Sequence, residues 1–372
     1  MKTSQKNSNV CKPDIVMPGG DRLDQQSGMR VLGFGDFADY YSFNSGTSLA
    51  APLAANLAAK LVAKYEHVNM QSIKALILNS AEPTGDERIM DDLNLKLKHE
   101  QSLERYEMNY EDLNKEQKKQ LNKLFSSESL YRNLIGFGRP NENQALFSNE
   151  KSVTLLLEDT IELRSHKTIS LNLPTYLLNY SKKDAILKLE ATLCYKFLPS
   201  WGNQLAYNPL HISFNFGNSY LQSEEKETAA LYAKDEHEYF NRFYQSDFSA
   251  EEKTKARKQA KGIKKDLQAW SDEFYPPSNK PFSNAQKLHL NINKAELEKV
   301  QGQISLIVRC IGKENLDAET TNYLVDHAHP FSIAIKISEK ITDELANFNL
   351  YDALIEINDL EGLAEGTATL DV

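Results

Sequence analysis

The residues with the clearest chemical potential lie in the stretch SFNSGTSLAAPLAANLAAKL, Ser42 to Leu61. Ser48 follows a glycine and a threonine and opens a run of alanines and leucines. Leucines recur at every fourth position from Leu49, which predicts a helix. The serine therefore has two possible roles. Its oxygen can cap the helix by accepting from free backbone N–H groups, or it can act as a nucleophile beside N–H groups that would stabilise an oxyanion.

The neighbouring elements would have to position this serine. The alanines between the leucines predict a thin helix that can lie close against a sheet, and Pro52 stands early enough in it to cost little. A second amphipathic helix is predicted over Gln71 to Ala81, and Pro83 would end it. Upstream, the apolar segment PDIVM predicts a short strand, followed by the turn signal Pro-Gly-Gly.

Three segments resemble one known family. GTSLAAP resembles the nucleophile motif Gly-Thr-Ser-x-Ala-x-Pro of the subtilisin-like serine proteases, the subtilases. KPDIVMPGG resembles the strand and turn that precede this serine in the family, with Met17 at the usual alanine. IGFGRPN resembles the turn that closes the domain, with Phe137 and Pro140 as departures. The resemblance covers about residues 10–85 and 134–142.

The resemblance implies a role for each residue around the serine. Ser48 would be the nucleophile and its backbone N–H one oxyanion donor, while Thr47 would be a supporting hydroxyl. Gly46 would let the backbone pass close to a bound peptide. Ser45 and Asn44 would line the cleft, although loop serines and asparagines are also common turn residues.

The base and acid that would activate Ser48 are not found upstream of it. In the subtilase order an aspartate comes first, a histidine second and the serine last. No histidine precedes Ser48, and none of the five earlier aspartates stands in an Asp-x-Gly setting: Asp14, Asp21, Asp24, Asp36 and Asp39. His67, which follows Ser48, would lie about 28 Å away along a continuous helix. The Gly-Asn segment that supplies an oxyanion side chain in the family is absent as well.

The chain is therefore expected to be the C-terminal portion of a subtilisin-like endopeptidase domain. Alone it should lack most of the rate enhancement, and it should fold poorly without the parallel sheet that would cover its helices. A truncated reading frame or a separate N-terminal half carrying aspartate and histidine would each explain this. The alternative is a catalytically inactive protein of the same ancestry that binds peptides or partners.

After about residue 150 the hydrophobic period changes to two. Segments such as SVTLLLED, ILKLEATLCYKF and FSIAIKIS predict seven or eight strands without interleaved helices, as in an antiparallel β-sandwich or jelly roll. The predicted fold class is therefore a partial subtilisin-like α/β domain over residues 1–150 and a sandwich over 151–340. Charged segments at 86–134 and 222–275 predict helical insertions. Residues 341–372 carry eight acidic residues and no basic one, and are expected to form a solubilising tail or a self-docking arm.

Composition limits the partners and the compartment. The sequence has 372 residues, 26% of them charged, and a net charge of −9, which argues against nucleic-acid binding. No membrane span or secretory signal is recognised, and the odd number of cysteines predicts buried thiols in a reducing cytoplasm. We expect a peptide or protein substrate, no membrane partner, no metal and no cofactor.

Three further features each have a common structural interpretation and a more specific functional one. The basic run from Lys253 to Lys265 is a solvated helix face or a polyanion contact. Trp201 is an edge aromatic or a partner anchor. His327 and His329 would share one face of a strand, as surface residues or as metal ligands.

Overall fold

The structure, a computed structural model, describes the following residues: 12–20, 28–32, 41–83, 135–163, 165–174, 176–177, 185–200, 207–218, 273–275, 283–299, 302–312, 316–340, 349–358, 361–363 and 367–369. They divide into two compact units. Unit 1 comprises Met1–Val10, Ala58–Asn79 and Glu142–Val372, and unit 2 comprises Cys11–Leu57 and Ser80–Asn141. Both helices and antiparallel sheets are present, so the fold is mixed α and β. The boundary expected at residue 150 stays a prediction.

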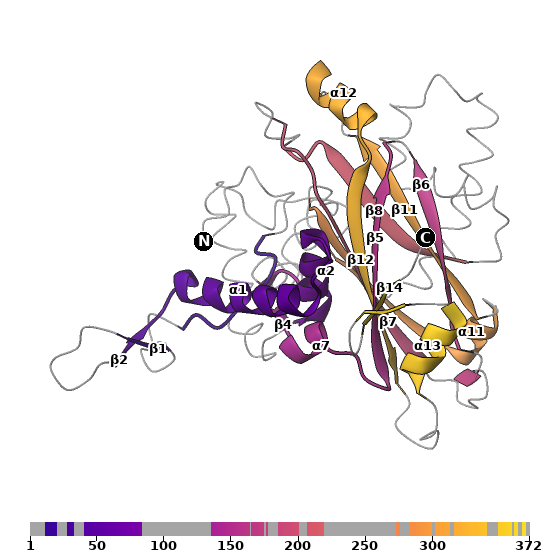
Figure 1. Ribbon diagram of the computed structural model, residues 1–372, viewed down its shortest axis with the longest axis horizontal. Coiled ribbons are helices and arrows are strands. Elements are labelled where there is room, and N and C mark those ends of the chain that lie inside the picture. Colours follow the sequence, from indigo (N-terminus) through magenta and orange to yellow (C-terminus); the bar gives the residue numbers. More distant parts are fainter. Residues whose placement is uncertain are drawn as a thin grey trace, which may run out of the picture. The chain divides into compact units, whose positions relative to one another are not determined.

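The largest element of unit 1 is a seven-stranded sheet (Figure 1). The strands lie in the order β13-β14-β5-β12-β7-β10-β9. The four long ones are β5 (Ser152–Ile161), β12 (His329–Glu339), β7 (Ala185–Tyr195) and β10 (Ala285–Asn293). The short ones are β9 (Glu273–Tyr275), β13 (Glu361–Leu363) and β14 (Thr367–Thr369). All pairings are antiparallel except that of β14 with β5, which is parallel.

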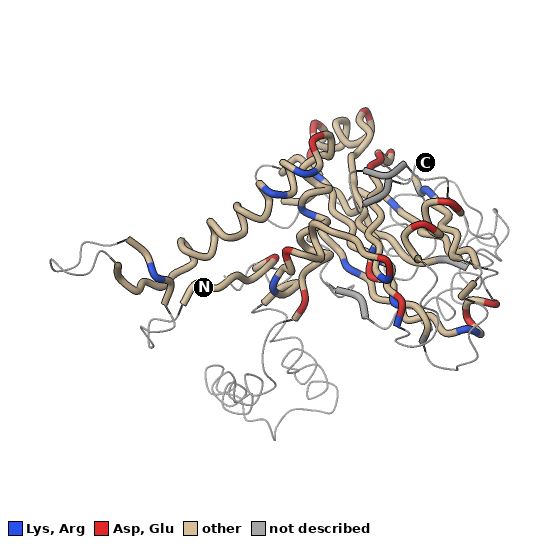
Figure 2. Tube along the Cα trace, turned by 60° about the horizontal axis from the view of Figure 1, so that its bottom comes forward, with Lys and Arg blue, Asp and Glu red and all other residues tan. Residues whose placement is uncertain are grey.

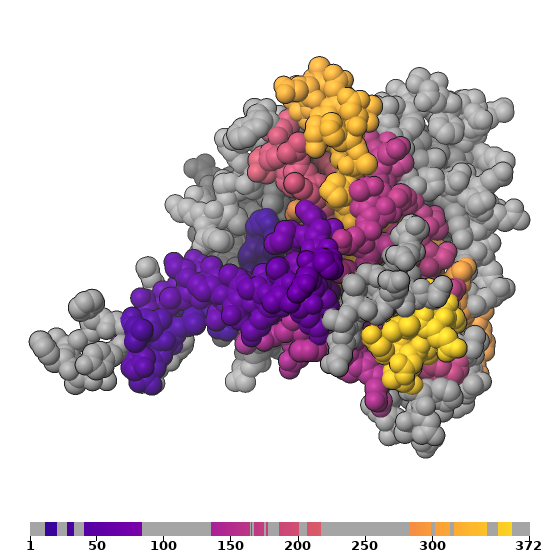
Figure 3. Space-filling model, in the orientation of Figure 1, coloured from indigo at the N-terminus to yellow at the C-terminus, as the bar shows by residue number. Residues whose placement is uncertain are grey.

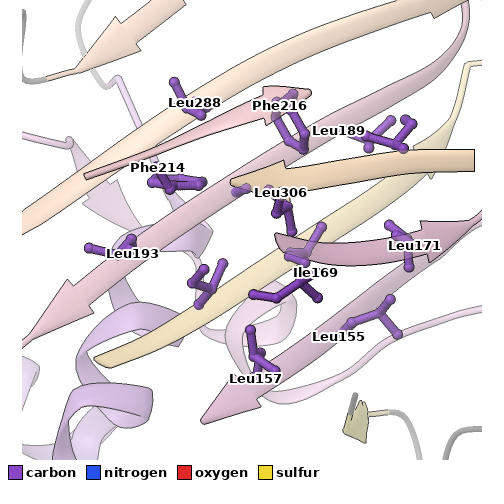
Figure 4. Close-up of a cluster of buried hydrophobic side chains, with 14 of the residues drawn as sticks. Leu155, Leu157, Ile169, Leu171, Leu189, Leu193, Phe214, Phe216, Leu288 and Leu306 are labelled. Atoms are coloured by element: carbon purple, nitrogen blue, oxygen red, sulfur yellow. The ribbon is translucent and has the colours of Figure 1, made fainter. Parts of the chain in front are cut away.

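A second sheet of unit 1 shares a hydrophobic core with the first. Its order is β6-β11-β8, with bounds His166–Asn172, Gln303–Gly312 and Leu210–Asn218. Alternate residues of both sheets point into one buried cluster, as the period of two predicts (Figure 4). Leu155, Leu189 and Leu288 enter it from the larger sheet, and Ile169 and Phe214 from the smaller.

The outer face of the seven-stranded sheet is largely polar and carries a helix. On β12, for example, Ile333 and Ile335 belong to the core, whereas Ser332 and Lys336 lie on the opposite face. Helix α2 (Met70–Ser80) packs on this face, and α1 (Thr47–Lys64), which enters unit 1 at Ala58, precedes it in the chain. Ser72 of α2 donates through its hydroxyl to the Ser332 hydroxyl at 2.9 Å.

The end of α1 lies next to the short helix α7 (Glu142–Leu146). The Tyr65 hydroxyl, just after α1, donates to the Leu146 carbonyl at 2.8 Å, and Lys60 pairs with Glu142 at 2.6 Å. Among these helices, α2 is supported by an antiparallel sheet. We expected α2 to span Gln71 to Ala81; it begins and ends one residue earlier, because Ala81 starts the strand β3 (Ala81–Glu82).

Three small helices complete unit 1: α11 (Lys294–Lys299), α12 (Ala318–Asp326) and α13 (Leu350–Asn358). The last lies in the segment expected to be an acidic tail. Leu350 and Leu354 are fully buried in the core cluster, and α13 packs beside β5 and β6 (Figure 3). Of the two roles considered for this segment, residues 349–358 take that of a docked arm.

Unit 2 contains the start of α1 and two strand pairs. Strand β1 (Met29–Leu32) pairs with β2 (Tyr41–Asn44), and β3 pairs with β4 (Arg139–Pro140). Residues 12–20 form no strand, so the strand expected for PDIVM was wrong; its backbone pairs with a tight turn instead of another extended segment.

Several predicted segments fall outside the described residues: the 86–134 insertion, Trp201, the basic run from Lys253 to Lys265 and most of the 222–275 insertion. The described end of the latter, β9, is a strand and not the predicted helix. Within the described chain, no helix is both long and apolar enough to cross a membrane.

Candidate active site around Ser48

Ser48 lies in the first turn of α1 and is exposed. The helix begins at Thr47, and the Gly46 carbonyl accepts from the N–H groups of Leu49 at 3.0 Å and Ala50 at 3.3 Å. Gly46 thus occupies the N-cap position, where its carbonyl begins the helical ladder. Among the described residues, the Ser48 hydroxyl takes part in no hydrogen bond. The capping role considered for this side chain is therefore not the one seen here.

The first turn is also free of charged side chains. From Thr47 to Ala59, α1 carries no acidic or basic residue (Figure 2). The partial positive charge of the helix N-terminus is therefore not neutralised by a carboxylate of the first turn. Such an environment favours an anion that develops next to Ser48.

A close backbone contact holds the serine loop against the segment KPDIVMPGG. The Gly46 N–H donates to the Gly19 carbonyl at 2.7 Å. A Cβ at Gly19 would lie 3.0 Å from the Gly46 oxygen and 3.4 Å from the Ala50 Cβ. A side chain at position 19 would therefore crowd this approach, and Gly46 itself has a φ of +155° that L side chains rarely adopt.

The third segment, IGFGRPN, binds the same stretch from its other end. The Phe137 N–H donates to the Asp14 carbonyl at 2.8 Å, and the Val16 N–H donates to the Gly138 carbonyl at 3.0 Å. The Phe137 ring is buried. The three segments that resemble the subtilase pattern, far apart in sequence, thus meet within unit 2.

The weaker site candidates have plain structural roles. The Asn44 side-chain oxygen accepts from the Ser45 N–H at 2.8 Å, as in an ordinary polar turn. Thr47 and Asn44 are exposed, and Ser45 is half-buried. Their places in a substrate cleft stay predictions.

Among the residues of unit 2 that the structure describes, we find no base for Ser48. These residues include no histidine, and their carboxylates are Asp14 and Glu82. Asp14 pairs with Lys12 at 2.5 Å. His67 is not part of α1, which ends at Lys64.

The pair His327 and His329 does not share a strand face, so that expectation was wrong. His327 follows α12, and its ring stacks on Tyr323 with centroids 4.2 Å apart. His329 is buried at the start of β12, and its Nε2 lies 3.0 Å from the Leu324 carbonyl. Burial lowers the pKa of His329, because the charged ring is desolvated there. In the described chain no group of three or more His, Cys, Asp or Glu side chains could hold a metal.

Comparison with known proteins agrees with this geometry. Residues 1–137 match the family model described as the subtilase family. The matched region includes Ser48 and the three contacting segments, apart from the end of the third. No curated protein matches the chain. Residues 1–137 of this chain therefore belong to the subtilase family.

Proposed function

We propose that the chain carries the serine-bearing portion of a subtilisin-like endopeptidase. In this proposal the Ser48 hydroxyl attacks a peptide carbonyl and forms an acyl-enzyme that water then hydrolyses. The observation that carries the proposal is the exposed Ser48 hydroxyl in the first turn of α1, behind a glycine loop that contacts Gly19. Serine chemistry of this kind needs no metal or cofactor.

The groups around Ser48 would stabilise the developing negative charge and let the substrate approach. Peptide N–H groups in the first turn of α1, that of Ser48 among them, would donate to the developing oxyanion. Thr47 would support the hydroxyl, and Gly46 would admit the substrate backbone. Ser45 and Asn44 would line the cleft. The substrate is a peptide or protein.

The proton acceptor would come from a separate N-terminal half that carries the aspartate and the histidine. A serine without its base retains only residual catalysis. The chain alone should therefore hydrolyse peptides about 10⁴–10⁶-fold more slowly than the chain combined with its N-terminal half. Reading the coding sequence upstream of residue 1 for Asp-x-Gly, His-Gly and Gly-Asn segments, in that order, is the first check. A catalytically inactive binding protein is the outcome if no such half exists.

The biochemical test is labelling with a fluorophosphonate, which reacts with activated serines. The chain alone should stay unlabelled, and the chain with a subtilase N-terminal half in trans should be labelled at Ser48. Ser48→Ala should abolish the label. The matched control Ser42→Ala removes a serine from β2, outside the proposed machinery, and should keep it. Labelling of the isolated chain would contradict the proposal that the base lies on another chain. Labelling of a serine other than Ser48 would contradict the assignment of Ser48 as the nucleophile.

We also infer that the two sheets of unit 1 form a β-sandwich appended to the peptidase portion. Their shared core supports this class, while the parallel pairing of β14 with β5 departs from a purely antiparallel one. Cys194 and Cys310 are buried thiols, as we expected, and we propose a cytoplasmic location.

A further inference from the structure

The outer face of the seven-stranded sheet holds one carboxylate among four basic side chains. Glu190 of β7 lies directly opposite Lys336 of β12 and His289 of β10. Its oxygens are 3.2 Å from His289 Nδ1, 3.1 Å from Lys188 Nζ, 3.9 Å from Lys287 Nζ and 3.8 Å from Lys336 Nζ. The three lysines carry three positive charges against the single negative charge of Glu190. Glu190 is the counter-ion on which the other members converge.

This carboxylate stays ionised in spite of its position. Only 5% of the Glu190 side chain is exposed. Burial alone would raise the pKa of Glu190, but the hydrogen bond with His289 and the charges of Lys287 and Lys188 outweigh it and hold the pKa well below its ordinary value. At neutral pH a buried negative charge therefore faces each lysine.

Lys287 also reaches the end of α2. Lys287 Nζ donates to the Asn79 carbonyl at 2.7 Å and to the Leu78 carbonyl at 3.4 Å. These carbonyls belong to the last turn of α2, where the ladder leaves acceptors unfilled and the helix dipole favours a cation. Lys287 lies opposite Thr192 on the sheet, and the Thr192 hydroxyl donates to the Asn79 side-chain oxygen at 2.9 Å. The end of α2 is thus attached twice to the same pair of strands.

The residues that follow α2 belong to the framework of the serine unit. Ser80 comes directly after Asn79, and its carbonyl accepts from the Asn141 N–H at 3.2 Å. Glu82 of β3 pairs with Arg139, next to Gly138, whose carbonyl accepts from Val16. Strand β3 begins at Ala81, directly after the last residue of α2.

We infer that Lys287, with Glu190 as its counter-ion, is a positioning residue that anchors the carboxyl end of α2, the turn that directly precedes β3 in the chain. This anchoring goes beyond the proposed function and does not depend on what Ser48 does. Among the described residues, the other two lysines of the cluster form no hydrogen bond or ion pair with the end of α2. Lys336 donates to Gln144 of α7 at 2.5 Å. Lys188 is 36% exposed, and its ion pair is with Glu190 of its own strand.

Hydrogen exchange of the full chain, followed by mass spectrometry, tests the inference. Lys287→Met removes the charge and keeps the length of the side chain. A hydrogen bond from a charged donor is worth roughly one to two powers of ten in an equilibrium, so amides from Leu78 to Glu82 should exchange at least about tenfold faster. The matched control Lys188→Met removes another partner of Glu190 and should leave these amides unchanged. Lys287→Arg keeps the charge and should restore most of the protection.

Each outcome decides the matter. Unchanged exchange over Leu78 to Glu82 in Lys287→Met, or an equal change in Lys188→Met, would overturn the inference. Lys287→Met could instead raise exchange at amides throughout the chain. In that case the double variant Glu190→Gln/Lys287→Met, which removes both charges, should show faster exchange at Leu78 to Glu82 alone. Absence of this local increase overturns the inference. Because the readout is exchange, a failure of Ser48 to label leaves this result standing.

Discussion

At the scale of single residues, Gly136 is a position of unit 2 that tolerates little change. Its φ is +64°, and a Cβ there would lie 2.0 Å from the Pro13 carbonyl oxygen. The backbone cannot move away easily, because the Phe137 N–H donates to Asp14. We expect Gly136→Ala to cost more than about 2–3 kcal/mol of local stability. Hydrogen exchange at the amides of Val16 and Phe137 measures this loss.

The control for this prediction is Gly302→Ala in unit 1. Gly302 also has a positive φ, +74°, but a Cβ there would meet the Leu173 oxygen at an ordinary 3.4 Å. That substitution carries conformational strain without a clash and should cost about 1–2 kcal/mol. An equal cost at both positions would show that the close approach of Pro13 is not what requires glycine at position 136.

At the scale of elements, α13 is expected to be part of the folded unit and not an appendage. Leu354 is fully buried in the core cluster, and the Asn358 amide donates to the Asn172 carbonyl at 2.9 Å. Leu354→Ala should therefore lower the free energy of unfolding by about 2–5 kcal/mol, as deletions in a packed core do. Urea denaturation of the full chain measures the change.

A second substitution in the same helix separates packing from helix propensity. Ile357 is 38% exposed. Ile357→Ala, in α13 as well, should change the stability by less than about 1 kcal/mol. Similar losses for Leu354→Ala and Ile357→Ala would mean that α13 does not dock through Leu354.

At the scale of the whole molecule, two buried ionisable groups shape the dependence of stability on pH. The pKa of His329 is lowered by burial, and that of Glu190 is lowered because its basic neighbours outweigh its burial. Each group binds fewer protons in the folded than in the unfolded state, so stability rises with pH in its window. On acidification the free energy of unfolding should begin to fall near pH 6.5, from His329, and fall further below about pH 4.5, from Glu190. Urea titrations at a series of pH values measure both losses.

Two variants assign these losses. His329→Gln should flatten the curve between pH 7 and 5, and a curve identical to that of the unaltered chain would contradict the role of His329. Glu190→Gln should flatten the more acidic part. It should also cost about 3–5 kcal/mol at pH 7, because three lysines lose their buried counter-ion.

The sequence by itself determined the features that depend on neighbours along the chain. Helical spacing from Leu49 predicted α1, and the period of two predicted the core strands, because both periodicities reflect which face of one element is buried. The residue types around Ser48 placed it at the start of a helix behind a glycine loop, since a helix start is a local property. The family match over residues 1–137 agrees with that assignment.

Only the tertiary structure decided what depends on distant segments. The members of the Glu190 cluster come from three strands and show no shared spacing, so strand order and register alone bring them together. The same holds for α2, which rests on an antiparallel sheet, and for Leu354, whose burial turned part of a predicted tail into a core helix. A strand needs a partner strand and a helix needs a surface to cover. No local pattern names either one, because the contacts that stabilise them join residues far apart along the chain.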